Sequence, residues 1–120
     1  MKVAFTTSGT TLDAPMDDRF GRARKFLVYD VETGGLEVID NEQNLNSPQG
    51  AGIQAAQTVS RAGASCLVTG HCGPKAFTVL EAAGIAVYTT GACTVMEALE
   101  LFRAGKLGRT WSADVDGHWA

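Results

Sequence analysis

Several features common in small proteins are missing from this chain of 120 residues. No run approaches the ~20 consecutive apolar residues that span a membrane, and the apolar start at 3–5 is too short for a secretory signal. No C-x-x-C pair occurs, which excludes a thioredoxin-like redox site. The three cysteines are an odd number that favours free thiols in a reducing compartment. We therefore expect a cytoplasmic protein.

The chain also has no large excess of charge of one sign, and this excludes further classes of protein. The net charge of −3 gives no overall attraction to nucleic acid or to an anionic membrane. The first predicted strand, VAFTT at 3–7, carries no carboxylate, so a two-metal nuclease centre is excluded. The chain has no Walker lysine loop and no plausible Ser/His/Asp set. With 45% apolar residues and 14 glycines, it is typical of one compact domain.

Strand patterns and helix patterns alternate along the chain. A turn signal at 33–35 joins the second and third strands into an antiparallel hairpin, and a loop is expected at 41–49. A capping box of Thr94 and Glu97 opens the last helix. Strands are predicted at 3–7, 26–31, 36–40, 65–69 and 85–89, and helices at 51–62, from Pro74 to Gly84 and from Thr94 to Gly105, with Ala76, Phe77, Leu80 and Ala83 as the inner face of the second.

This order of elements predicts an α/β fold, a ribonuclease-H-like three-layer sandwich. The mixed five-stranded sheet should have the order 3-2-1-4-5, with strands 1, 4 and 5 parallel. Right-handed crossovers then put helices on both faces. The domain should cover residues 1–107, and residues 108–120 show no clear period and are expected to form a C-terminal tail.

A short motif occurs twice, as TGHC at 69–72 and as TGAC at 90–93. The glycines at 63, 84 and 105 are also 21 residues apart, so one strand–loop–helix unit is used twice. Ligands of parallel sheets bind at the carboxyl ends of the strands, where both motifs fall. Neighbouring strands lie ~4.8 Å apart, so Cys72 and Cys93 are expected to face one another across a shallow crevice.

Several groups near this edge favour an anion. The end of strand 1 at Ser8 should open at the same rim, and helices starting at Pro74 and Thr94 should present unpaired N–H groups. Lys75 lies at the mouth. The first loop adds Arg19, Arg22 and Arg24, so we expect a positive rim although the chain is acidic. Residues 9–24 have no hydrophobic period and should be mobile until cargo orders them.

Each candidate side chain also has a plain structural interpretation. Cys66 lies inside a strand and is expected to be a small core residue. Cys72 and Cys93 are either packing residues at loop ends or ligands, and as ligands they would favour copper(I). His71 is either a surface residue or a soft-metal ligand or proton donor. The aspartates at 13, 17 and 18 are expected to form a solvated loop face.

At this point the motifs, taken in order, are similar to those of a known family. DRFGRA at 18–23, FLVYDVETG at 26–34, GAGIQAAQ at 50–57 and TGHCGPKA at 69–76 precede a capped helix. This arrangement resembles the NifX / dinitrogenase iron–molybdenum cofactor-binding family over residues 1–107. The order and spacing of the motifs carry the resemblance, since none is specific alone.

The resemblance implies a non-enzymatic carrier of an anionic molybdenum–copper sulfide cluster, held without covalent protein–metal bonds. It also implies a link to cell division with MinD/Mrp-type P-loop ATPases. Three alternatives stay open: a carrier of a nitrogenase-type iron–molybdenum–sulfur cofactor, a small-anion or nucleotide-binding module, and an interaction protein that only docks on an ATPase. No catalytic residue is predicted.

The residues predicted to contact the cluster combine backbone donors, basic side chains and soft or apolar cover. Cys72, Cys93 and His71 are candidate metal ligands, none of them obligatory. The predicted cofactor-binding residues are Ser8, Met16, Arg19, Phe20, Gly21, Arg22, Gly70, His71, Cys72, Gly73, Lys75, Gly91, Ala92, Cys93 and Thr94.

Overall fold

The computed structural model describes residues 1–45 and 50–111. Within them, one mixed sheet has the order β3-β2-β1-β4-β5-β6. Strands β1, β4 and β5 are parallel, and β2, β3 and β6 run antiparallel to their neighbours. This confirms the predicted order and adds a sixth strand. The strands are β1 Lys2–Thr7, β2 Lys25–Asp30, β3 Leu36–Asp40, β4 Cys66–Thr69, β5 Ala86–Thr89 and β6 Arg109–Thr110.

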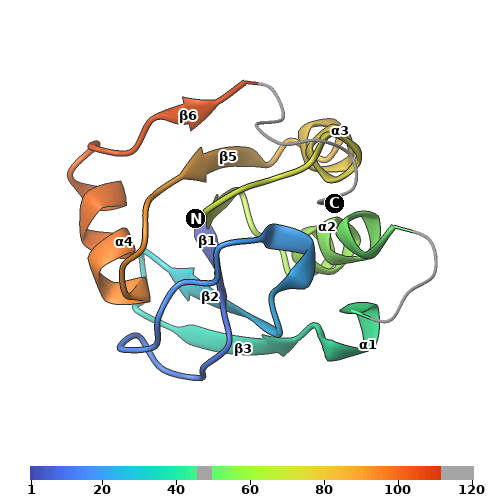
Figure 1. The fold of residues 1–120 in the computed structure, drawn as a ribbon. Helices are drawn as coiled ribbons and strands as arrows, with labels where there is room; N and C mark the ends of the chain where they lie inside the picture. Colours follow the sequence, from blue (N-terminus) through green and yellow to red (C-terminus); the bar gives the residue numbers. More distant parts are fainter. Residues whose placement is uncertain (46–49, 112–120) are drawn as a thin grey trace.

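Helices cover both faces of the sheet, as the three-layer prediction requires. Helices α2 and α3 lie on one face and α4 on the other (Figure 1). The helices are η1 Phe20–Arg22, α1 Glu42–Leu45, α2 Ala51–Arg61, α3 Pro74–Ala82 and α4 Val95–Arg103.

Successive residues of the central strands pack alternately into the two core layers, one on each face of the sheet. In β1, Ala4 packs toward α2 and α3, whereas Val3 and Phe5 pack toward α4, and none of the three is exposed. A strand buried on both faces has a continuous apolar run, and the sequence shows one at 3–5. The same alternation separates Leu67 from Val68 in β4. No helix in the described part of the chain is long and apolar enough to cross a membrane.

The predicted helix ends agree with the backbone. Gly63, Gly84 and Gly105 have φ values of 82°, 77° and 70°, the left-handed conformation expected just past a helix. The capping box of Thr94 and Glu97 is present at the start of α4. The glycines after the helices and the capping box were therefore predicted correctly.

Three local predictions were wrong. The predicted loop at 41–49 contains the short helix α1, and the rest of that segment, 46–49, lies outside the described residues. Buried side chains hold α1, since the Asn41 amide donates to the Ala23 carbonyl at 2.7 Å and the Asn44 amide donates to Asn41 at 2.6 Å. Part of the predicted tail, Arg109–Thr110, pairs with β5. Ala83, predicted to face inward, is exposed.

Candidate functional site

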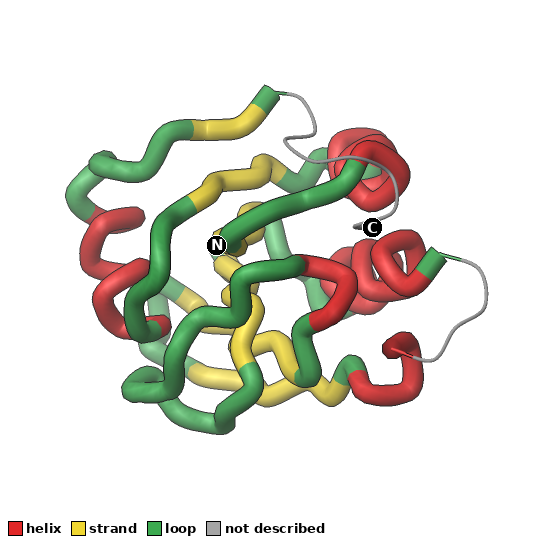
Figure 2. The backbone as a smooth tube through the Cα atoms, viewed as in Figure 1, coloured by secondary structure: helices red, strands yellow, loops and turns green. Residues whose placement is uncertain are grey.

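A cavity of about 220 Å³ lies at the carboxyl ends of the parallel strands. The loops that leave these strands are among the segments coloured green in Figure 2. This is the edge where ligands of open α/β sheets bind. The cavity is lined by Met16, Asp17, Asp18, Gly70, Thr90, Gly91 and Ala92.

The first loop is tied across the strand ends. The Thr6 and Thr7 hydroxyls donate to the Asp17 and Pro15 carbonyls, each at 2.8 Å. The Met16 N–H donates to the Cys93 carbonyl at 2.8 Å, so the loop reaches from β1 to the segment after β5. These bonds place the loop against the strand ends as a wall of the cavity, and the ordering of residues 9–24 by cargo stays a prediction.

Gly70 is present because the first loop crosses directly over it. A Cβ on Gly70 would clash with the Asp18 carbonyl oxygen and would lie 2.6 Å from its Oδ1 and 2.9 Å from its Cα. Gly70 itself is buried. The glycine of TGHC therefore permits the close approach of two backbones, as expected of glycine beside a ligand or a turn.

The start of α4 does not offer the unpaired N–H groups predicted for it. The Val95 and Met96 N–H groups donate to carbonyls of the first loop, at 2.9 and 2.8 Å. The Thr94 N–H donates to the Glu97 carboxylate at 2.9 Å, and the Glu97 N–H donates to the Thr94 hydroxyl at 3.2 Å. All four donors are satisfied within the protein. The prediction was wrong because the first loop already caps this helix.

Other backbone donors at this edge remain open. Helix α3 begins at Pro74, which has no N–H, and its N-cap Gly73 supplies no side-chain cap. Among the described residues, no acceptor bonds the N–H groups of Lys75 or Ala76. Gly91 and Ala92 line the cavity, and their N–H groups also have no acceptor within residues 1–45 and 50–111. The start of α3 thus keeps N–H groups without a partner among the described residues, although none of its residues lines the cavity.

The two matched cysteines do not face one another. Cys72 is 1% exposed and packs in the core on the α2 and α3 side, whereas Cys93 is half-buried and packs on the α4 side. They lie on opposite faces of the sheet, and neither lines the cavity. The expectation of a crevice between them was wrong. In the described part of the chain, no group of three or more His, Cys, Asp and Glu residues is placed to hold a metal ion.

The remaining predicted residues divide into those that line the cavity, those that are buried, those that are exposed and those in between. Met16, Gly70, Gly91 and Ala92 line the cavity. Phe20 is 1% exposed, with its ring centroid 5.6 Å from that of Phe26, so it belongs to the core and does not cover the cavity. Gly21 and Gly73 are also buried, whereas Ser8, Arg19, Arg22 and Lys75 are exposed, with His71 and Thr94 in between.

The cavity wall is more acidic than the sequence indicated. Asp17 accepts a hydrogen bond from the Arg19 N–H at 3.3 Å, and the Asp18 carboxylate lies 3.6 Å from His71 Nε2. Both aspartates and Thr90 were missed as site residues. The signal for the aspartates was their place at and just before the start of DRFGRA, on the first loop, and the signal for Thr90 was its place in the repeated motif TGAC. None of the predicted basic side chains lines the cavity, and the Arg22 guanidinium donates to the Leu45 carbonyl of α1 at 3.2 Å.

Comparisons with known proteins agree with this fold over nearly its whole length. Residues 1–105 match the family model described as dinitrogenase iron-molybdenum cofactor. The structure of the apo form of the orange protein from Desulfovibrio gigas is similar, with 40% identity and a TM-score of 0.91 over 95% of this chain and 96% of that chain.

Two further proteins are similar over most of their length. A Thermotoga protein of the DUF35 family has 34% identity and a TM-score of 0.81 over 95% of this chain and 98% of that chain. An uncharacterized protein of Methanocaldococcus jannaschii is 31% identical over 110 residues, 89% of each chain. The chain therefore belongs to the dinitrogenase iron-molybdenum cofactor family.

Proposed function

We propose that the protein is a non-enzymatic carrier that binds an anionic metal–sulfur cluster as cargo at the carboxyl edge of its sheet. One observation carries the proposal. The cavity of about 220 Å³ is lined by Gly91 and Ala92, whose backbone N–H groups have no partner among the described residues, although Asp17 and Asp18 also stand in its wall. Unpaired N–H groups directed at one place favour an anion.

The cluster would be held by hydrogen bonds and charge. Its sulfides accept weak hydrogen bonds, and glycine lets backbone donors come close. Met16 supplies a soft, polarizable wall. Arg19, Arg22 and Lys75 are exposed and would approach the part of the cluster outside the cavity.

The cysteines have a smaller role in this proposal. Cys72 is buried, so it would reach a cluster only after the loop opened. The Cys93 thiol lies 3.9 Å from the Thr90 hydroxyl, beside the cavity wall, and would act as a soft neighbour of the cargo. Neither thiol is required as a ligand.

For the identity of the cargo, we propose a molybdenum–copper sulfide cluster. The 40% identity to an orange protein supports a cargo of this class, while the family as described points to iron–molybdenum cofactor. We also propose MinD/Mrp-type P-loop ATPases as partners, on the family resemblance alone. Binding to such an ATPase in a pull-down with purified proteins tests the partner.

An absorption spectrum with metal analysis tests the cargo. Purified protein is mixed with tetrathiomolybdate and copper(I), desalted and measured. Charge-transfer bands that elute with the protein, with a constant metal-to-protein ratio, support the proposal. Iron in place of copper in protein from its native host would favour the nitrogenase-type cofactor, and colourless protein in both experiments would contradict a cluster carrier.

A further inference from the structure

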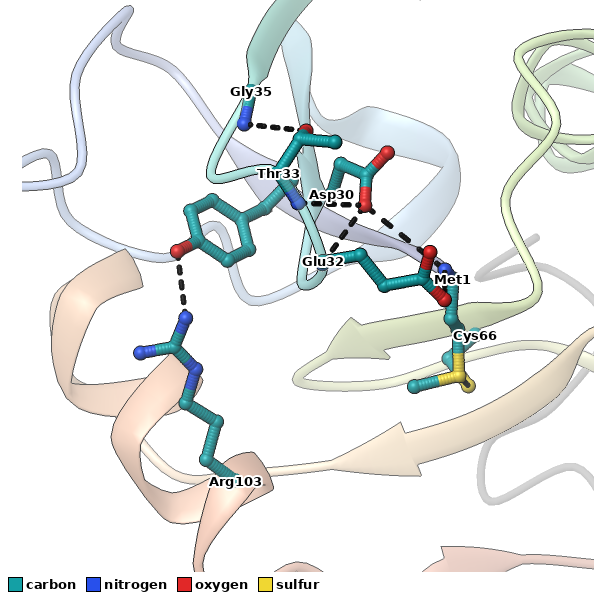
Figure 3. Close-up of polar contacts among 8 residues, drawn as sticks. Met1, Asp30, Glu32, Thr33, Gly35, Cys66 and Arg103 are labelled. Atoms are coloured by element: carbon teal, nitrogen blue, oxygen red, sulfur yellow. Dashed lines mark hydrogen bonds and ion pairs between the residues drawn. The ribbon is translucent and has the colours of Figure 1, made fainter.

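A pair of sulfur atoms lies at the opposite, amino edge of the sheet. The Cys66 thiol donates to the Met1 thioether across 4.0 Å. Figure 3 shows the two sulfurs side by side. Because Val3 is the register partner of Cys66 in the parallel β1–β4 pair, Met1 and Cys66 lie at the starts of these strands. The cluster cavity lies at the other ends.

Met1 is held in place although it is the first residue. The Val31 N–H donates to the Met1 carbonyl at 3.0 Å, which adds Met1 to the end of the sheet. Its amine lies 3.2 Å from Glu32 and 4.0 Å from Asp30. First residues usually fray unless they are tied down in this way. The Met1 backbone is therefore held beside the start of β4, and from there its thioether reaches the Cys66 sulfur.

Burial and access differ between the two sulfurs. Cys66 is 7% exposed, whereas Met1 is 46% exposed, so an ion could enter along the Met1 side chain. Burial raises the pKa of the Cys66 thiol, and the charges of Arg109 and the terminal amine oppose that effect. The empty pair is thus protonated, with the thiol hydrogen between the two sulfur atoms.

We propose that Met1 and Cys66 form a binding site for a soft monovalent cation such as copper(I) or silver(I). Thiolate and thioether are the ligands that select copper(I). With metal–sulfur bonds of ~2.3 Å, sulfurs this far apart would subtend about 120° at the ion, which suits a three-coordinate site whose third ligand is solvent beside the exposed Met1. The ion takes the place of the thiol proton: Cys66–SH and M⁺ give Cys66–S–M and H⁺. No electron is transferred.

Silver(I) is the probe, because it needs no reductant. In the Cys72→Ala/Cys93→Ala background, Cys66 is the only thiol of the chain. Calorimetric titration in chloride-free buffer should give one site. Met1→Leu, made behind a removable leader, should weaken it at least tenfold. Met96→Leu is the matched control, since Met96 is half-buried on the same core, and should change nothing.

Equal affinity in the background and in its Met1→Leu variant would overturn the proposal, because the site would then be a thiol alone. If the Cys72→Ala/Cys93→Ala background does not fold, the same silver(I) titration is made in the wild-type chain. There Met1→Leu should weaken one of the silver(I) sites at least tenfold, and an unchanged set of affinities would overturn the proposal. No variant used as evidence lies in the cluster cavity, so failure here is separable from failure of the carrier proposal.

Discussion

The backbone of Asp18 passes so close to Gly70 that no side chain fits between them. The first loop and the segment after β4 therefore meet at this contact. Both residues line the cavity. Gly70→Ala should force the loop away and lower the free energy of unfolding by ~1–3 kcal/mol, the usual cost of overpacking.

Urea denaturation measures that loss, and Gly91→Ala is the matched control. No atom lies within 4 Å of a Cβ placed on Gly91, although this glycine lines the same cavity. The free energy of unfolding of Gly91→Ala should stay within about 0.5 kcal/mol of the wild-type value. Equal stability of the two variants would show that the contact at Gly70 does not hold the loop.

The capping box gives a prediction for pH. The Thr94 backbone N–H and then its hydroxyl hold the pKa of Glu97 below its ordinary value of 4.5. Stability from this interaction is present above pH 4.5 and is lost as the pH falls through the lower folded pKa. Glu97→Gln should flatten the stability–pH curve in that window.

Thr94→Ala complements this test at neutral pH. It should cost about 1 kcal/mol, the usual value for loss of an N-cap. Chemical denaturation between pH 3 and pH 7 measures both variants. An unchanged pH slope in Glu97→Gln would mean that the carboxylate does not stabilise the start of α4.

Cluster retention should respond in opposite directions to basic and acidic substitutions. Arg19→Ala and Lys75→Ala should each weaken it by ~1–2 kcal/mol if the contacts are charge-assisted. Asp18→Asn should strengthen it by about 0.5–1 kcal/mol, because it removes an exposed like charge from the wall. Equilibrium dialysis with the loaded cluster measures all three, and no change in the Arg19/Lys75 double variant would contradict an electrostatic contribution.

The two matched cysteines should behave differently. Cys72→Ser places a hydroxyl in the core and should lower stability by ~1–3 kcal/mol. Cys93→Ser, at a half-buried position, should leave the fold intact and alter only affinity and the spectrum. Stoichiometric loss of copper in folded Cys93→Ser would establish that thiol as a true ligand.

The parts predicted correctly from sequence depend on neighbouring residues. The capping box of Thr94 and Glu97 and the glycines after each helix are local signals. The sheet order follows from the hairpin and from right-handed crossovers. The order of these elements in the chain was enough to place the cavity at the carboxyl edge.

The errors arose where distant backbone segments meet. Val95 and Met96 donate to carbonyls of the first loop, and a carbonyl acceptor leaves no mark in the sequence. The faces of Cys72 and Cys93 were also unpredictable. Both residues follow the end of a strand, so the alternation of strand side chains no longer determines their direction.

The most direct test of the carrier proposal is ¹H–¹⁵N NMR of the protein titrated with the molybdenum–copper sulfide cluster. The account predicts saturable binding, with the largest amide shifts at 16–18, Gly70 and 90–92 and at the start of α3. Amides of the β2–β3 hairpin, which is far along the sheet order from β5, should stay unchanged. Shifts centred elsewhere, or no binding, would contradict the account.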